Sequence, residues 1–313
     1  MLLPQTGESA TRENVLYIGK EAEKEGLDSL WVFERLLWPL NPQTPYGGVP
    51  GVPIPVEYQN VLDPLETLTY VAGNTQRISL GTSIIDMPFH NPVTLARRFA
   101  TLDVLSGGRL IVGLGIGWSK DEYDASGIPY KHRGARADEF LQTLKRIWTE
   151  DVIEFKGKFY NIPASKIGPK PLQKPHPPIL LGAFSPNAFS RIVKYADGWI
   201  PIAGFGPLEQ IEQAINVLRE RARKENKDPS NIRIVVLTYP NVSSDSSSPP
   251  STTSSSNQQR LPMSGTIDQI GSDVEQIKTM GTEHIIFGYA FSPIGKDVKR
   301  MIDITKQLAK FAK

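Results

Sequence analysis

TLDVLSGGRLIVGLGIGW, residues 101–118, is the stretch of sequence that decides the predicted fold. Residues 96–105 are apolar at helical spacing, and Gly107-Gly108 follows where a helix end needs a positive φ. Arg109 to Leu114 is a short apolar run bounded by glycines, which is typical of a strand buried on both faces of a parallel sheet. The stretch therefore predicts one helix–strand unit with a functional rim. The backbone at that rim can approach a flat or bulky group because glycines alternate there, at Gly113, Gly115 and Gly117.

The rest of the chain repeats this unit, and the repeats predict the fold class. Eight strand-like segments alternate with eight helix-like segments, and the first strand starts abruptly at Met1. Eight units in 313 residues favour a closed (β/α)8 TIM barrel over an open doubly wound sheet, and no GxGxxG motif follows the first strand. We therefore predict an α/β fold, with one barrel domain over residues 1–313 and its active site at the carboxyl ends of the strands. The predicted strands span residues 2–4, 29–33, 78–85, 109–114, 178–181, 198–201, 232–238 and 284–287, and the helices around them span 11–24, 63–74, 91–105, 133–148, 186–195, 207–224, 266–280 and 296–311.

Three stretches do not fit the repeat and are predicted as insertions after strands 2, 4 and 7. Residues 38–62 are rich in proline and glycine, and they could cover the mouth of the barrel as a lid or be a plain surface excursion. Residues 152–160 have the pattern of a small hairpin that turns at Lys156-Gly157. Residues 241–259 are mostly Ser, Thr and Pro, a composition that cannot bury a core. We expect this last stretch to be a low-complexity, disordered loop.

The composition excludes several classes of function. The net charge is +2, from 35 basic and 33 acidic residues, so neither nucleic acid nor a membrane surface is an expected partner. The absence of cysteine excludes disulfides, thiolate nucleophiles and Cys-ligated metals. The four histidines show no HExxH spacing, so no metal is expected, and neither a GxSxG elbow nor a P-loop is present. No segment reaches the apolar length of a membrane span and the first residues do not form a signal peptide, so the cytoplasm is the expected location.

Polar residues follow the second predicted strand. Glu34 and Arg35 together could hydrogen-bond the polar edge of a ligand, and Trp38 could stack on it. The alternative is a Glu34–Arg35 ion pair that closes the rim of the barrel. Their position at a strand's carboxyl end favours the functional interpretation.

The third strand carries an irregular end. Thr82 and Ser83 are small hydroxyl residues inside a buried strand, which indicates a bulge or a close backbone approach. His90, taken alone, is more often a capping or surface residue than a catalyst. Asn91 before Pro92 is a plausible helix cap with proline at the first helical position.

The fifth strand exits through Gly182-Ala183-Phe184-Ser185, and Pro186 starts a helix. Free backbone N–H groups, a hydroxyl and a helix N-terminus together form an anion site, which would suit a phosphorylated ligand. A plain N-cap by Ser185 is the alternative.

Four motifs in order carry a family likeness: NPVTLARRFA, the 101–118 stretch, RADEFLQTLKRIWTE and PPILLGAFSPNAFSRIVKYADGWIP. They resemble the luciferase-like monooxygenase superfamily, and most nearly its coenzyme F420-dependent oxidoreductases. The likeness runs from about residue 22 to residue 199. It implies a (β/α)8 barrel that binds a flavin-like ring at its carboxyl mouth, commonly as a homodimer.

The resemblance also implies roles for individual residues. Ser83-Ile84 stands where deazaflavin members carry a cis peptide that backs the ring. The family's Asp-His pair falls on Glu34-Arg35, and Arg35 replaces a histidine that can donate a proton, which an arginine cannot easily do. Residues 182–185, including Ala183, match the phosphate site. In the family, one segment lines the cofactor's ring and tail, and its positions match Gly115, Gly117, Trp118 and Asp121.

On this resemblance, the expected function is that of an F420-dependent oxidoreductase which transfers a hydride between the deazaflavin C5 and a small organic substrate. Glu34 and Arg35 would be the catalytic residues, and Trp38 and His90 would line the substrate pocket. One alternative is an FMN-dependent monooxygenase that uses reduced flavin and O2. A second alternative is a non-catalytic barrel that binds the cofactor, which Arg35 in place of histidine favours.

Overall fold

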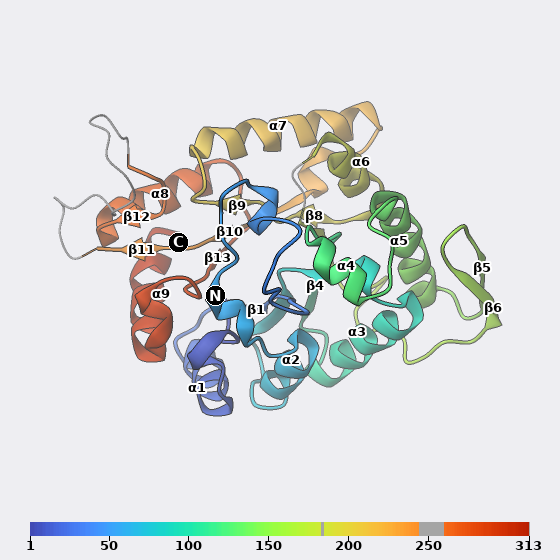
Figure 1. Ribbon diagram of the computed structural model, residues 1–313, viewed down its shortest axis with the longest axis horizontal. Coiled ribbons are helices and arrows are strands. Elements are labelled where there is room, and N and C mark those ends of the chain that lie inside the picture. Colours follow the sequence, from blue (N-terminus) through green and yellow to red (C-terminus); the bar gives the residue numbers. More distant parts are fainter. Residues whose placement is uncertain (183–184, 244–259, 313) are drawn as a thin grey trace.

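The computed structural model describes residues 1–182, 185–243 and 260–312, and it shows a curled sheet inside a ring of helices (Figure 1). The strands of this sheet are parallel, in the order β1-β2-β4-β7-β8-β10-β13, and two short strands extend it because β3 pairs with β4 and β9 with β10. The α/β class and the parallel arrangement are as predicted. The strands are β1 (Ser29–Val32), β2 (Ser79–Thr82), β3 (Ile85–Asp86), β4 (Leu110–Gly115), β7 (Ile179–Leu181), β8 (Gly198–Trp199), β9 (Ile202–Ala203), β10 (Arg233–Thr238) and β13 (His284–Phe287).

Residues 1–3 lie between the two edge strands of the sheet. The Leu2 amide donates to the Phe287 carbonyl at 2.8 Å, and the Trp31 amide donates to the Met1 carbonyl at 2.9 Å. Leu2 makes one isolated bridge to Trp31 instead of the strand predicted at 2–4. The prediction of a full strand is wrong because Pro4 has no N–H with which to continue a ladder. Backbone hydrogen bonds nevertheless connect β13 to β1 through these residues.

The helices around the sheet begin and end within about two residues of their predicted limits. Asn91 caps α3 by accepting from the Val93 and Thr94 amides, and the same helix ends at Gly107, whose φ is 72°. The described residues contain one further α-helix, α4, which has only six residues and was not predicted because it shows no apolar period. The helices are α1 (Arg12–Lys24), α2 (Pro64–Ala72), α3 (Pro92–Ser106), α4 (Lys120–Ala125), α5 (Arg133–Thr149), α6 (Pro186–Tyr195), α7 (Leu208–Lys224), α8 (Ile267–Thr279) and α9 (Val298–Ala312). Among the described residues, no helix combines the length and the apolar character needed to cross a membrane.

The strands are buried on both faces, and successive residues therefore enter two different cores. Leu30 and Val32 of β1 pack in the core between sheet and helices. Trp31, between them, packs on the opposite face with Leu180, Val235 and other side chains that fill the inside of the curl. This inner core continues toward the carboxyl ends of the strands, where Ile54 and Tyr58 belong to it.

The third predicted strand is interrupted as expected. Thr82 Oγ1 donates to the Gly113 carbonyl at 2.7 Å and accepts from the Gly113 amide at 2.8 Å. The side chain of Thr82 thus takes the place of backbone pairing at the end of β2. The chain bends at residues 83–84 before β3 resumes pairing with β4.

The three predicted insertions have different outcomes. The hairpin consists of β5 (Ile153–Lys156) and β6 (Asn161–Ser165), so it turns where predicted but extends further, and it follows α5. Within the loop predicted at 241–259, β11 (Asn241–Val242) pairs with β12 (Ser264–Gly265), so the first two residues are strand and not disordered. Residues 244–259 lie outside the described residues. The segment 38–62 contains two of the short 3-10 helices, which are η1 (Gly7–Ser9), η2 (Tyr46–Gly48), η3 (Val56–Gln59), η4 (Met87–Phe89), η5 (Pro229–Asn231) and η6 (Pro293–Lys296).

Candidate functional site at the carboxyl ends of the strands

Ile84 is the residue around which the predicted site residues gather. The Glu34 amide donates to the Ile84 carbonyl at 3.0 Å. Gly115 and Gly182 face the Ile84 side chain, because a Cβ added to them would lie 1.8 and 3.2 Å from its carbons. The peptide bond Ser83-Ile84 is cis, as the family resemblance implied. The structure therefore brings the ends of β1, β2, β4 and β7 together at one mouth.

Glu34 is buried, with 7% of its surface exposed, and it uses both carboxylate oxygens. Oε1 lies 2.7 Å from Nε2 of His90, and Oε2 accepts from the Asp86 amide at 2.9 Å. The alternative ion pair between Glu34 and Arg35 is wrong, because His90 and not Arg35 is the partner of Glu34. Sequence spacing could not reveal this pair, since residues 34 and 90 are 56 positions apart.

Arg35 pairs with Glu122 of α4, a residue that the sequence did not single out. Arg35 Nη2 lies 2.9 Å from Glu122 Oε2, and the two side chains are only 5% and 1% exposed. The guanidinium also lies over the rings of Trp118 and Tyr58, 4.7 and 5.2 Å from their centroids. Burial raises the pKa of Glu122, and the Arg35 charge opposes that shift. Arg35 Nε has no hydrogen-bond partner.

Asp86, at the end of β3, is a second acidic residue that sequence reasoning did not single out. It is 5% exposed, and its Oδ1 has no hydrogen-bond partner. The carboxyl lies beside the glycine-rich exit of β4, because Cβ atoms added to Gly115 and Gly117 would approach it to 2.7 and 3.3 Å. Burial, and then the charges of Glu34 and Glu122, raise the pKa of Asp86 to about 8. The signal in the sequence was a lone acid directly after the apolar pair Ile84-Ile85.

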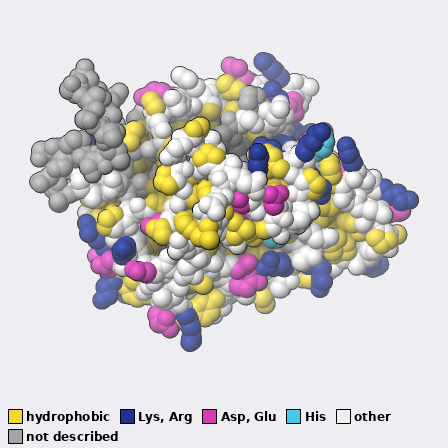
Figure 2. Space-filling view, viewed as in Figure 1, with side chains coloured by type: hydrophobic (Ala, Val, Ile, Leu, Met, Phe, Trp, Pro, Cys, Tyr) yellow, Lys and Arg dark blue, Asp and Glu magenta, His cyan; other side chains and the backbone are white. Residues whose placement is uncertain are grey.

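The segment 38–62 crosses this mouth. Tyr46 packs edge-on against Trp118, with ring centroids 5.6 Å apart, and its hydroxyl lies 3.1 Å from that of Tyr58. Asp121, predicted to contact a cofactor, accepts from the Gln43 amide at 3.1 Å. Trp38 is also held within the segment, where its Nε1 donates to the Ile54 carbonyl at 3.4 Å. In Figure 2, hydrophobic side chains gather at the centre of the face that Figure 1 shows, where this segment (blue in Figure 1) runs over the sheet.

The predicted phosphate site is described only in part. The Gly182 amide donates to the Leu114 carbonyl at 2.9 Å, which fixes the end of β7 beside β4. Ser185 is exposed and caps α6, since its hydroxyl accepts from the Ala188 amide at 3.3 Å. Ala183 lies outside the described residues. The N-cap role of Ser185 is therefore confirmed. The anion site at the same position stays a prediction.

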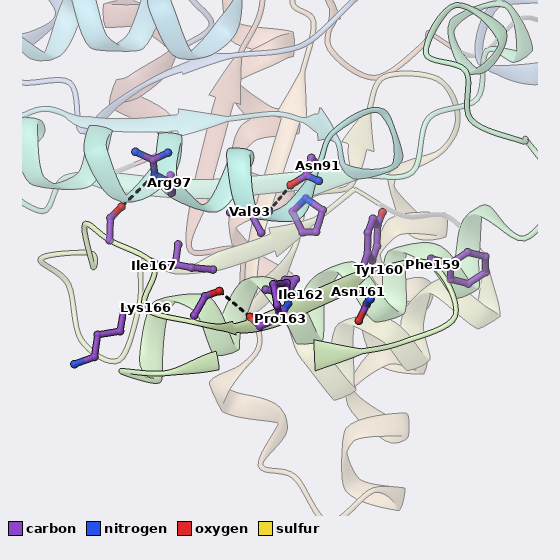
Figure 3. Close-up of a pocket in the computed structure, with 13 residues that line it drawn as sticks. Asn91, Val93, Arg97, Phe159, Tyr160, Asn161, Ile162, Pro163, Lys166 and Ile167 are labelled. Carbon is purple, nitrogen blue, oxygen red and sulfur yellow. Dashed lines mark hydrogen bonds between the residues drawn. The ribbon is translucent and has the colours of Figure 1, made fainter. Parts of the chain in front are cut away.

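The described residues show two further features. No three His, Asp or Glu side chains among the described residues are placed to hold a metal ion. A cavity of about 640 Å³ lies elsewhere, between the start of α3 and the β5–β6 hairpin. Figure 3 shows Asn91 and Arg97 on one side of it and Asn161 and Ile162 on the other. None of the residues gathered around Ile84 lines that cavity.

A parallel α/β fold with glycines and buried charged groups at the carboxyl ends of its strands defines a class of protein that binds a small ligand there. Comparison with known proteins makes the class specific. The profile of the luciferase-like monooxygenase family matches residues 2–248. The chain belongs to this family, whose members are oxidoreductases.

Similar proteins include several that are named for coenzyme F420. An uncharacterized protein of Mycobacterium tuberculosis is 36% identical over 181 residues, which are 57% of this chain and 64% of that protein. An F420-dependent glucose-6-phosphate dehydrogenase of Amycolatopsis mediterranei is 31% identical over 216 residues, 67% of this chain and 60% of that protein. The match thus spans less than two thirds of either relative. A solved F420-dependent secondary alcohol dehydrogenase, in complex with an F420–acetone adduct, is 20% identical with a TM-score of 0.76, covering 95% of this chain and 94% of that one.

Proposed function

We propose that the chain is an F420-dependent oxidoreductase that transfers a hydride between the deazaflavin and a small organic substrate. The observation that carries the proposal is a set of buried polar atoms without partners at the mouth, namely Arg35 Nε, Ser83 Oγ and Asp86 Oδ1. Unsatisfied buried polar atoms are costly and rare, so a group that satisfies them is expected. A deazaflavin or flavin ring has a polar edge of alternating N–H and C=O groups that fits this set.

The barrel is part of this proposal. If residues 1–3 are counted as the first strand, eight strands follow one another around the sheet, and the hydrogen bond from the Leu2 amide to the Phe287 carbonyl would close it. Such a (β/α)8 barrel places ligands at the carboxyl mouth of its strands. The predicted insertions after strands 2, 4 and 7 are numbered on this proposed barrel.

Different residues around the mouth would contact different parts of the cofactor. Ile84 would back one face of the ring, because its side chain already covers the glycines at positions 115 and 182. Trp118 would bound the ring's side, and residues 182–185 with the N-terminus of α6 would hold the phosphate. When bound, a deazaflavin supplies hydride transfer at its C5. Glu34, held by His90, would orient the polar edge of the ring or the substrate.

The sequence allows either a lid or a surface excursion for the segment 38–62, and its contacts support the lid. Tyr46 and Tyr58 pack on Trp118, Arg35 and Phe291 at the mouth, which leaves them in the way of a planar ligand. The segment would move outward to admit the ring and close over it to exclude water. A surface excursion would make no such contacts.

The family also contains monooxygenases, and FMN is therefore the alternative cofactor. The F420-dependent relative at 31% identity favours the deazaflavin. A non-catalytic cofactor-binding barrel is the second alternative, which Arg35 favours because a guanidinium is a poor proton donor. The homodimer, the small-molecule substrate and the cytoplasmic location stay predictions.

Replacing Ser185 by Asp should weaken binding of F420 by about tenfold or more. Aspartate is as good an N-cap as serine, so α6 should still form, but its charge would face the phosphate at the helix N-terminus. The matched control is Ser185→Asn, which also caps and is neutral. Fluorescence titration of the three proteins with F420 measures the effect. Equal affinities for all three would place the phosphate elsewhere.

A further inference from the structure

We propose that Asp86 is the proton donor of this site and presents an Oδ1–H group to an oxygen or nitrogen atom of the bound ligand. The proposal rests on the proposed function for the identity of that ligand. It answers a question which the sequence left open, because Arg35 stands where a proton-donating histidine is expected.

Asp86 has a fixed backbone and a buried carboxyl oxygen that lacks a hydrogen-bond partner. Its backbone is fixed, since its amide donates to Glu34 Oε2 at 2.9 Å. Its carboxyl lies beside Gly115 and Gly117 at the exit of β4, next to the Ile84 side chain that is proposed to back the ring. The Gly117 amide lowers the pKa of the carboxyl, yet Oδ1 is buried and has no hydrogen-bond partner. A buried carboxyl oxygen in that state is costly unless a ligand satisfies it.

The charges around Asp86 favour the protonated form. Glu34, at the end of β1, and Glu122, on α4, add two carboxylates to the effect of burial. Arg35 and the Gly117 amide oppose them and are outweighed, so the pKa of Asp86 rises to about 8. The other titratable neighbours are His90, whose ring contacts Oε1 of Glu34, and Tyr123 of α4, whose hydroxyl donates to the Ile116 carbonyl. At neutral pH the Asp86 carboxyl therefore carries a proton.

The other two buried carboxylates at the mouth, those of Glu34 and Glu122, already have partners. Both oxygens of Glu34 have partners, and Glu122 is held by the Leu36 amide at 2.8 Å and by Arg35. Arg35 stays charged throughout the physiological range. Among the described residues at the mouth, Asp86 is thus the carboxyl with a free oxygen and a proton to give.

The chemistry balances with Asp86 in this role. Reduction of a carbonyl substrate adds a hydride, supplied by a reduced deazaflavin, to carbon and leaves the oxygen in need of one proton. Before the substrate enters, Asp86 Oδ1–H would hydrogen-bond the edge of the ring. With the substrate bound, it would give its proton to the substrate oxygen and become a carboxylate, which would later regain a proton from water. In the reverse direction, the carboxylate accepts the proton of an alcohol.

The first test needs no ligand. Infrared difference spectra of the parent protein against Asp86→Asn, recorded from acid to alkaline pH, should show the carbonyl band of a protonated carboxyl that disappears with a midpoint near 8. Glu34→Gln removes a carboxylate that raises this pKa, so it should move the midpoint downward. Asp124→Asn, an exposed carboxyl on α4, should leave the midpoint unchanged. A midpoint near the ordinary value of 3.8 would overturn the proposal.

The second test measures F420 binding as a function of pH. In the parent, affinity should fall about tenfold per pH unit above pH 8, because the donor loses its proton. Asp86→Asn keeps an N–H donor of the same shape and should lack this fall. The ratio of the two affinities cancels any titration of the ligand itself. Identical pH profiles would refute the role of Asp86 and leave the proposed function intact. No F420 binding at any pH would refute the proposed function, and the infrared titration would still decide whether Asp86 holds a proton.

Discussion

Replacing Arg35 by Ala should lower the free energy of unfolding by about 3–5 kcal/mol. The substitution leaves the Glu122 carboxylate buried without the cation that lies 2.9 Å from it. It also removes the guanidinium from between Trp118 and Tyr58, where it stacks on both rings. Urea denaturation of the parent and the variant at neutral pH measures the difference.

A second substitution separates these two contributions. Glu122→Gln in the Arg35→Ala background removes the unpaired charge, so the double variant should be more stable than Arg35→Ala alone. The packing loss at Trp118 remains in both proteins. A loss below about 1 kcal/mol for Arg35→Ala would mean that the pair behaves like an exposed ion pair and that the mouth is open to water.

Replacing Gly113 by Ala should destabilise the protein by roughly 3 kcal/mol. A Cβ at this position would lie 1.8 Å from the Thr82 carbonyl oxygen. That oxygen belongs to the backbone and cannot move aside without breaking the two hydrogen bonds between Thr82 and Gly113. Thermal and urea unfolding both measure the loss.

Gly73→Ala is the matched control for Gly113→Ala. Gly73 has a right-handed helical conformation, with φ −72°, and a Cβ there would make only ordinary contacts at 3.8 Å or more. The stability of the Gly73→Ala variant should stay near that of the parent or rise slightly. Equal stabilities for Gly113→Ala and Gly73→Ala would show that β2 and β4 are not packed as closely as described.

The regular part of the fold was predictable because its signals are local. Apolar periodicity and caps such as Asn91 and Gly107 lie within one helix, and the structure confirms both. Residues 1–3 and helix α4 were not correctly predicted because their structure depends on neighbours that are remote in sequence. Leu2 is placed by Phe287, and α4 is too short to show a period of its own.

The candidate site was predictable only as a location. Position after a strand singled out Glu34, Gly115 and Gly182, and a small hydroxyl residue inside a buried strand singled out Ser83. The structure brings these residues together around Ile84.

The electrostatic pairs at this location were beyond reach of the sequence. Glu34 and His90 come from different repeats, as do Arg35 and Glu122. Asp86 gains its raised pKa from charges on other elements, which no local pattern contains. The sequence therefore predicts where the site lies, but only the packing of the whole chain determines which charged side chains contact one another there.

Calorimetric titration of the parent protein with F420 and, separately, with FMN tests the central claim most directly. We expect F420 to bind saturably at one site per chain, and more tightly than FMN, because the deazaflavin is the proposed cofactor. Saturable binding of FMN together with no binding of F420 would contradict the claim and assign the mouth to a flavin.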